Sequence, residues 1–66
     1  MMNNYTRKPK YTLDEIFYSF LRLFPNQGAD IENAMARGQY EANTLGLTGE
    51  EAWHHIYAVV DEIIDH

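Results

Sequence analysis

The sequence predicts an all-α fold: a compact three-helix bundle preceded by a short, flexible, basic N-terminal arm. Three stretches carry apolar residues at the i, i+3, i+4, i+7 spacing of amphipathic helices. Turn-forming residues separate them, and T-x-x-E motifs precede the first and the third. Short turns between amphipathic helices are typical of a bundle. We therefore expect an arm at residues 1–10 and one domain at residues 11–66, with helices at about 12–24, 30–45 and 49–65.

Size and composition restrict how such a domain is stabilised. The chain has 66 residues and no cysteine. A domain this small is near the lower limit for a self-sufficient hydrophobic core, and disulfides or thiolate metal sites are excluded. Five Tyr, three Phe and one Trp are many for this length, and each aromatic side chain can bury roughly 150–250 Å². Dense aromatic packing is therefore the expected source of stability.

Charge is divided unevenly along the chain. Arg7, Lys8 and Lys10 lie in the first ten residues without an acidic residue among them. Arg22 and Arg37 are the other basic residues, and all ten Asp and Glu belong to the body, so the whole chain has a net charge of −5. The body is therefore strongly acidic, which favours basic partners and disfavours nucleic acid.

The first helix has the clearest signals. Thr12 and Glu15 form a T-x-x-E capping box, with Tyr11 and Ile16 at the hydrophobic-staple positions. Pro25 disfavours helical geometry at the preceding residue and ends the helix there. The predicted inward residues are Leu13, Ile16, Phe17, Phe20, Leu21 and Phe24.

The second helix is predicted to begin at Asp30, a good N-cap residue, and to end before Gly46, which suits a left-handed C-terminal cap. Gly38 lies in its interior and costs about 1 kcal/mol relative to alanine. Small residues also allow a neighbouring helix to approach closely, which would compensate. The predicted inward residues are Ile31, Ala34, Met35, Gly38, Ala42 and Leu45.

In the third helix Thr48 and Glu51 repeat the capping box, and the apolar stripe continues almost to the end of the chain. The predicted inward residues are Ala52, Trp53, Ile56, Tyr57, Val60, Ile63 and Ile64.

The segment between the second and third helices resembles the centre of a helix-turn-helix motif. Ala42 precedes the turn glycine, Gly46, by four residues, and the turn reads L-G-L-T from Leu45 to Thr48. The resemblance implies the shape of the motif. DNA readout would need Arg, Lys, Asn or Gln on the next helix, and that helix begins Gly49-Glu50-Glu51 without any Lys or Arg.

Histidines on the third helix form i, i+4 pairs with acids, which are Glu50/His54, Glu51/His55 and Glu62/His66. Imidazole and carboxylate together suit zinc or nickel. Adjacent residues of a helix lie about 100° apart around its axis, so one ion would not bind both His54 and His55. Solvated pairs of this kind are common on helix surfaces, and we expect no metal ligands.

Two surface features favour a protein partner. Tyr18, Arg22 and Leu23 lie outside the apolar stripe of the first helix, and aromatic and Arg residues are enriched in interface cores. An acidic face would steer the domain towards a basic surface. It comprises Glu41, Glu50, Glu51, Asp61, Glu62 and Asp65.

Catalysis is not expected, because Ser19 has no histidine near it in sequence and a small bundle offers little room for a substrate pocket. No cofactor is expected either. The longest apolar run is far shorter than the ~20 residues of a membrane helix, and no signal-peptide pattern follows the basic start. We therefore expect a soluble, cytoplasmic protein.

The functional prediction is a small acidic, non-enzymatic protein-binding domain, an adaptor or inhibitor of a larger protein with a basic surface. Its carboxylates would stand in for nucleic-acid phosphates, as in the acidic inhibitors of phages. The alternative is a homodimeric structural or assembly module. A nucleic-acid binder of helix-turn-helix shape, or a His/Glu metal-binding protein, ranks third.

Overall fold

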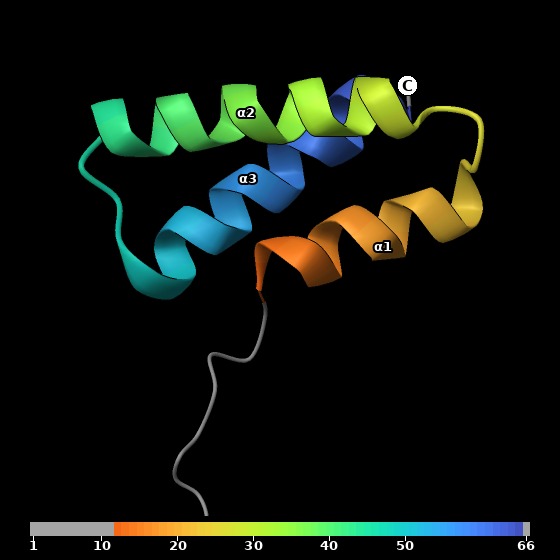
Figure 1. Ribbon diagram of the computed structural model, residues 1–66. Helices are drawn as coiled ribbons and strands as arrows, with labels where there is room; N and C mark the ends of the chain where they lie inside the picture. Colours follow the sequence, from red (N-terminus) through yellow and green to blue (C-terminus); the bar gives the residue numbers. More distant parts are fainter. Residues whose placement is uncertain (1–11, 66) are drawn as a thin grey trace, which may run out of the picture.

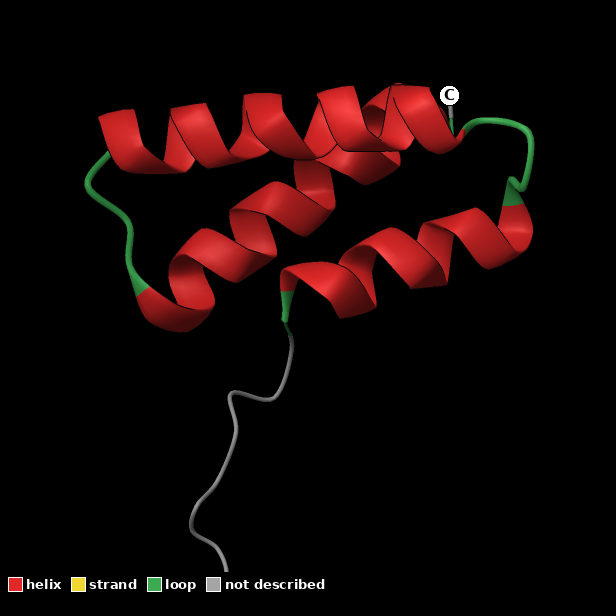
Figure 2. Cartoon of the chain, viewed as in Figure 1, coloured by secondary structure: helices red, strands yellow, loops and turns green. Residues whose placement is uncertain are grey.

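The computed structural model describes residues 12–65 and confirms the all-α three-helix bundle. The helices are α1 (Leu13–Leu23), α2 (Gly28–Thr44) and α3 (Gly49–Ile64). Figure 1 shows that α2 runs opposite to α1 and α3, so that the end of α3 lies beside the start of α2. Loops alone connect the helices within this part of the chain (Figure 2). The predicted basic arm and Tyr11 of the predicted staple lie outside the described residues.

The start of α1 has the predicted capping box. The Glu15 backbone N–H donates to Thr12 Oγ1, and the Thr12 N–H donates to Glu15 Oε1, both at 3.2 Å. The helix ends at Leu23, and the Phe24 N–H still reaches the Phe20 carbonyl at 2.8 Å. A turn through Pro25 follows, closed by a hydrogen bond of 3.0 Å from the Gln27 N–H to the Phe24 carbonyl. The two predicted ends of this helix are therefore correct to within one residue.

The start of α2 differs from the prediction. Gln27, not Asp30, is the N-cap residue, and its carbonyl accepts a hydrogen bond from the Ile31 N–H at 2.8 Å. Helical hydrogen bonding therefore begins before Asp30, which lies within the first turn. An acid in that position interacts favourably with the positive end of the helix dipole, so Asp30 favours the helix without capping it.

The end of α2 is a Schellman motif. The Leu47 N–H donates to the Ala42 carbonyl at 2.9 Å, and the Gly46 N–H donates to the Asn43 carbonyl at 3.1 Å. Gly46 has φ +75°, the left-handed conformation that this motif requires at its C′ position. The predicted role of Gly46 is confirmed.

The predicted capping box of α3 does not form. Thr48 is the N-cap residue, but its side chain makes no capping hydrogen bond. Gly49, the first residue of the helix, has φ +59°. This left-handed backbone at the helix entrance distinguishes the start of α3 from that of α1, where the capping box forms.

The core is narrower than the apolar stripes suggested. Its fully buried members come from all three helices, and Phe17, Leu21, Phe24, Met35 and Trp53 pack against them partly buried. The buried core residues are Ile16, Phe20, Ile31, Ala34, Ala42, Ile56, Val60 and Ile64.

Four residues predicted to face inward are exposed instead. Leu13 lies at the first turn of α1 and Leu45 lies just past the end of α2, where no neighbouring helix covers them. Tyr57 and Ile63 lie on the two flanks of the α3 stripe, about 60° from its centre on a helix of 3.6 residues per turn. Helix ends and stripe edges are where periodicity alone overestimates burial.

Gly38 explains how α2 and α3 fit together. A Cβ atom added to this glycine would lie 2.9 Å from the Ile56 Cα, closer than real Cβ contacts. The predicted compensation for its poor helix propensity is therefore confirmed: the missing side chain lets the two backbones approach. The α2 and α3 backbones approach each other most closely, whereas the α1 backbone comes near α2 at fewer points and near α3 at fewer still.

Across residues 12–65, no helix combines the length and the hydrophobicity needed to span a membrane.

Candidate functional site

The outer face of α3 carries five exposed carboxylates, and the structure places all of them away from the core. They are Glu50, Glu51, Asp61, Glu62 and Asp65. Eleven residues make about three helical turns, so Asp61 and Glu62 lie directly along the helix from Glu50 and Glu51. Within residues 12–65, none of these carboxylates forms an ion pair with a basic side chain.

The two ends of this acidic face differ in their effect on the helix. Glu50 and Glu51 lie in the first turn, where negative charge is stabilised by the helix dipole. Asp61 and Glu62 lie in the last turn and Asp65 is the C-cap residue, where a cation would be favourable and an anion is not. The described last turn of α3 has no basic residue. The acids at the C-terminal end are therefore not explained by helix stability.

Glu41, the sixth predicted acid, lies apart from this face. His55 Nε2 is 2.9 Å from Glu41 Oε1, and Arg37 Nε donates to Glu41 Oε2 at 3.3 Å. A carboxylate can only accept hydrogen bonds, so Nε2 carries the imidazole proton in this pair. The hydrogen bond from His55 and, after it, the one from Arg37 lower the pKa of Glu41 below its usual value. Glu41 thus links α2 to α3 and is not a free acid for recognition.

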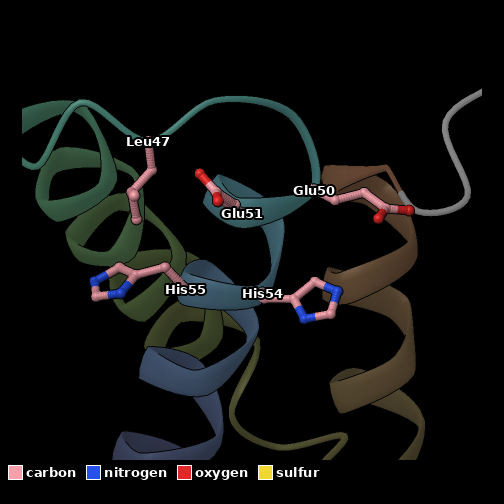
Figure 3. A pocket seen from close by; sticks show the side chains of 5 residues that line it. All are labelled: Leu47, Glu50, Glu51, His54 and His55. Atoms are coloured by element: carbon pink, nitrogen blue, oxygen red, sulfur yellow. The ribbon is translucent and has the colours of Figure 1, made fainter.

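The adjacent histidines diverge, as their spacing predicts. Figure 3 shows His55 directed towards α2 and His54 directed towards α1, on either side of an open hollow. Leu47, Glu50 and Glu51 line the rest of the hollow. Among the described residues, no group of three or more His, Cys, Asp or Glu side chains is arranged to hold a metal ion. The pair Glu62/His66 lies partly outside those residues.

The predicted patch on α1 is not one surface. Tyr18 is 59% exposed and Leu23 is 71% exposed, but five residues of a helix turn through about 500°, so the two side chains point about 140° apart. Tyr18 shares its face with Arg22, and its ring meets the edge of Phe17 at a centroid distance of 5.2 Å. Leu23 lies one turn after Ser19, on the same flank of α1 as that residue.

A groove between α1 and α3 was not anticipated from the sequence. Ser19 of α1 lines it on one side, and Trp53, His54 and Tyr57 of α3 line it on the other. The Phe20 and Tyr57 rings are in contact beneath it, with centroids 5.0 Å apart and planes inclined by 50°. The sequence did contain one indication of this groove, the i, i+4 pair of aromatic residues Trp53 and Tyr57 in α3. Spacing within α3 could not show that this pair would line a groove beside α1.

Comparison with known proteins gives no relative: no protein-family model matches the chain, and neither the curated proteins nor the solved structures contain a match. The function must therefore be inferred from the charge and geometry of these surfaces.

Proposed function

We propose that this chain is a small acidic, non-enzymatic protein-binding domain that acts as an adaptor or inhibitor of a larger protein with a basic surface. The observation that supports this most is the trio Asp61, Glu62 and Asp65. These exposed acids lie at the helix end where negative charge is unfavourable. Residues that oppose local stability are expected mainly where function requires them.

The acidic face also supports mimicry of nucleic-acid charge. The five carboxylates are distributed over residues 50–65, from the first turn of α3 to its C-cap residue, a length of about 22 Å at 1.5 Å per residue. One strand of B-DNA places one phosphate about every 3.4 Å along the axis, or roughly six over that length. A helix with five carboxylates therefore has nearly the linear charge density of a single strand. A basic groove that binds nucleic acid is the kind of surface it would fit, as for acidic inhibitors of the phage type.

A charge-matched pair of variants tests this proposal. The first neutralises the end of α3 with Asp61→Asn, Glu62→Gln and Asp65→Asn. The control neutralises three exposed acids elsewhere, with Asp14→Asn, Asp30→Asn and Glu32→Gln. Wild type and both variants are used to capture partners from the source lysate over a salt series.

We expect the captured protein to be retained by the control, lost by the α3 variant, and released steeply as salt rises. Equal capture by all three proteins would contradict a role for this face. Capture that does not depend on salt would contradict charge steering.

Exposed apolar side chains favour a homodimer as the second candidate. Leu23, Tyr40 and Leu45 are 71%, 72% and 63% exposed, and such side chains in a small domain are candidates for covering by a second copy. Sedimentation at high concentration distinguishes this candidate from the first. A dimer that Leu23→Glu dissociates without loss of helical content would support it, whereas a monomer at all concentrations would exclude it.

A further inference from the structure

The groove between α1 and α3 has acids beyond both of its ends. Glu50, His54, Tyr57 and Asp61 follow the i, i+4, i+7, i+11 spacing and so form one row along α3. His54 and Tyr57 line the groove, and the two acids flank it on the helix that forms this wall. Eleven residues separate the acids, which is about 16 Å along the helix.

We propose that this groove binds a basic amphipathic helix of the partner, in which two cations about three turns apart pair with Glu50 and Asp61 while apolar side chains between them enter the groove. The inference rests on the proposed function, since it specifies how the acidic domain recognises its partner. Trp53 and Tyr57 supply the aromatic surface for the apolar side chains and for the stems of Lys or Arg.

A helix is a better occupant than an extended segment. Residues 12–65 contain no strand whose edge could pair with an extended backbone, and unpaired backbone groups are costly to bury. A helix satisfies its own backbone hydrogen bonds and can place an apolar row between two neighbouring helices. Charge is complementary as well, because α3 carries no Lys or Arg and five exposed acids.

The basic residues of this chain itself do not match the spacing. Arg7, Lys8 and Lys10 fall within four consecutive positions of the sequence. Three residues of extended chain span at most about 11 Å between Cα atoms, less than the roughly 16 Å that separates Glu50 from Asp61 along the helix. A partner helix with cations eleven positions apart matches that separation directly.

A designed peptide tests the inference without knowledge of the natural partner. The probe is an alanine- and glutamine-rich helix with arginines eleven positions apart and leucines four and seven positions after the first arginine. The control peptide has the same composition with the second arginine moved to the opposite face. Neither contains tryptophan, so the single tryptophan of the protein, Trp53, reports occupation of the groove by fluorescence.

We expect saturable binding of the probe with a change in Trp53 emission, and at least tenfold weaker binding of the control peptide. Ser19→Leu fills the groove from an exposed position of α1 and should weaken probe binding at least tenfold. Ala36→Leu, at an exposed position of α2 away from the groove, should leave it unchanged. Glu50→Gln and Asp61→Asn should each weaken it severalfold.

The outcomes separate this inference from the proposed function. If Ser19→Leu binds the probe like wild type while the triple variant of Asp61, Glu62 and Asp65 does not bind it, the groove inference is wrong and the acidic face stands. If partner capture survives that triple variant, the proposed function is wrong. Binding seen only after Arg7→Gln, Lys8→Gln and Lys10→Gln in the full chain would assign the groove to the N-terminal segment and overturn the inference.

Discussion

The two contacts of α3 with its neighbouring helices differ in almost every respect. Towards α2, the helix is packed so closely that Gly38 has no room for a methyl group beside Ile56. The hydrogen bond between His55 and Glu41 further joins the two helices. Towards α1, the same helix presents Trp53 and Tyr57 to an open groove.

The difference places a closely packed helix pair and an open aromatic groove on two sides of one helix. On one side, the missing side chain of Gly38 lets the α2 and α3 backbones pack closely. Aromatic residues on the other side, Trp53 and Tyr57, are too large for close helix approach and line the groove. Substitutions in the three helices and their turns test this division.

Truncating the core at the α2–α3 contact should have the largest effect. Ile56 is 2% exposed and Ile63, on the same helix, is 46% exposed. We expect Ile56→Ala to lower the free energy of unfolding by about 2–5 kcal/mol, and the chemically identical change Ile63→Ala to lower it by roughly 1 kcal/mol. Urea denaturation measures both. Similar losses for the two variants would contradict the burial difference.

Adding a methyl group at Gly38 should destabilise the same contact. The overpacking cost of Gly38→Ala is about 1–3 kcal/mol, and the better helix propensity of alanine offsets about 1 kcal/mol of it. The control is Gly28→Ala, where the nearest atom to the new methyl, Leu21 Cδ1, is at an ordinary distance of 3.6 Å. Thermal unfolding should show a net loss for the first variant and little change for the second. A stabilised Gly38→Ala protein would show that the helices are not in close contact.

Gly46 allows backbone strain to be separated from crowding. A Cβ at this position would meet no atom within 4 Å, but the residue has φ +75°. We expect Gly46→Ala to lower the free energy of unfolding by about 1 kcal/mol through the left-handed backbone alone, and Gly46→Asn to lose less, because asparagine tolerates this conformation. Equal losses for alanine and asparagine would argue against a Schellman motif here.

The smallest effect is the pH dependence of the link between α2 and α3. The hydrogen bonds from His55 and Arg37 lower the pKa of Glu41. These hydrogen bonds therefore stabilise the fold fully at pH values above 4.5, the ordinary pKa of the carboxyl group. Their contribution to the free energy of unfolding is lost as the pH falls through the lower pKa of the folded state.

Glu41→Gln should remove this dependence, so that its stability declines less steeply with acid than that of wild type. Glu32→Gln, at an exposed acid of the same helix, should leave the decline unchanged. Denaturation midpoints measured from pH 6 to pH 2 test the difference, and parallel curves for the two variants would contradict it.

Local signals predicted some features correctly and misassigned others for identifiable reasons. The Thr12–Glu15 box and the Gly46 cap depend on residues within a few positions of one another, so the sequence contains all that they require. Thr48 and Glu51 match the same T-x-x-E motif, but the capping hydrogen bond of Thr48 does not form. At this helix entrance Gly49 adopts a left-handed backbone. Spacing alone could not reveal that conformation.

The candidate site was also only partly predictable. The carboxylates of α3 share a face because helical periodicity requires it, and that face follows from the sequence. Glu41 was grouped with them by its charge, but His55, fourteen positions away, holds it at the α2–α3 contact. Tyr18 and Leu23 were grouped by their hydrophobicity, although five residues of helix turn them onto different sides.

By itself the sequence determined the three helices, the turns between them and the acidic outer face of α3, because each depends on local hydrogen bonding or on a fixed number of residues per turn. The tertiary structure alone decided which flank of each helix is covered. Gly38 admits Ile56 and lets the α2 and α3 backbones come close, whereas the α1 and α3 backbones stay farther apart, with an aromatic groove between them. Whether a residue at the edge of an apolar stripe is buried depends on where the neighbouring helix lies. The sequence pattern of one helix therefore cannot predict it.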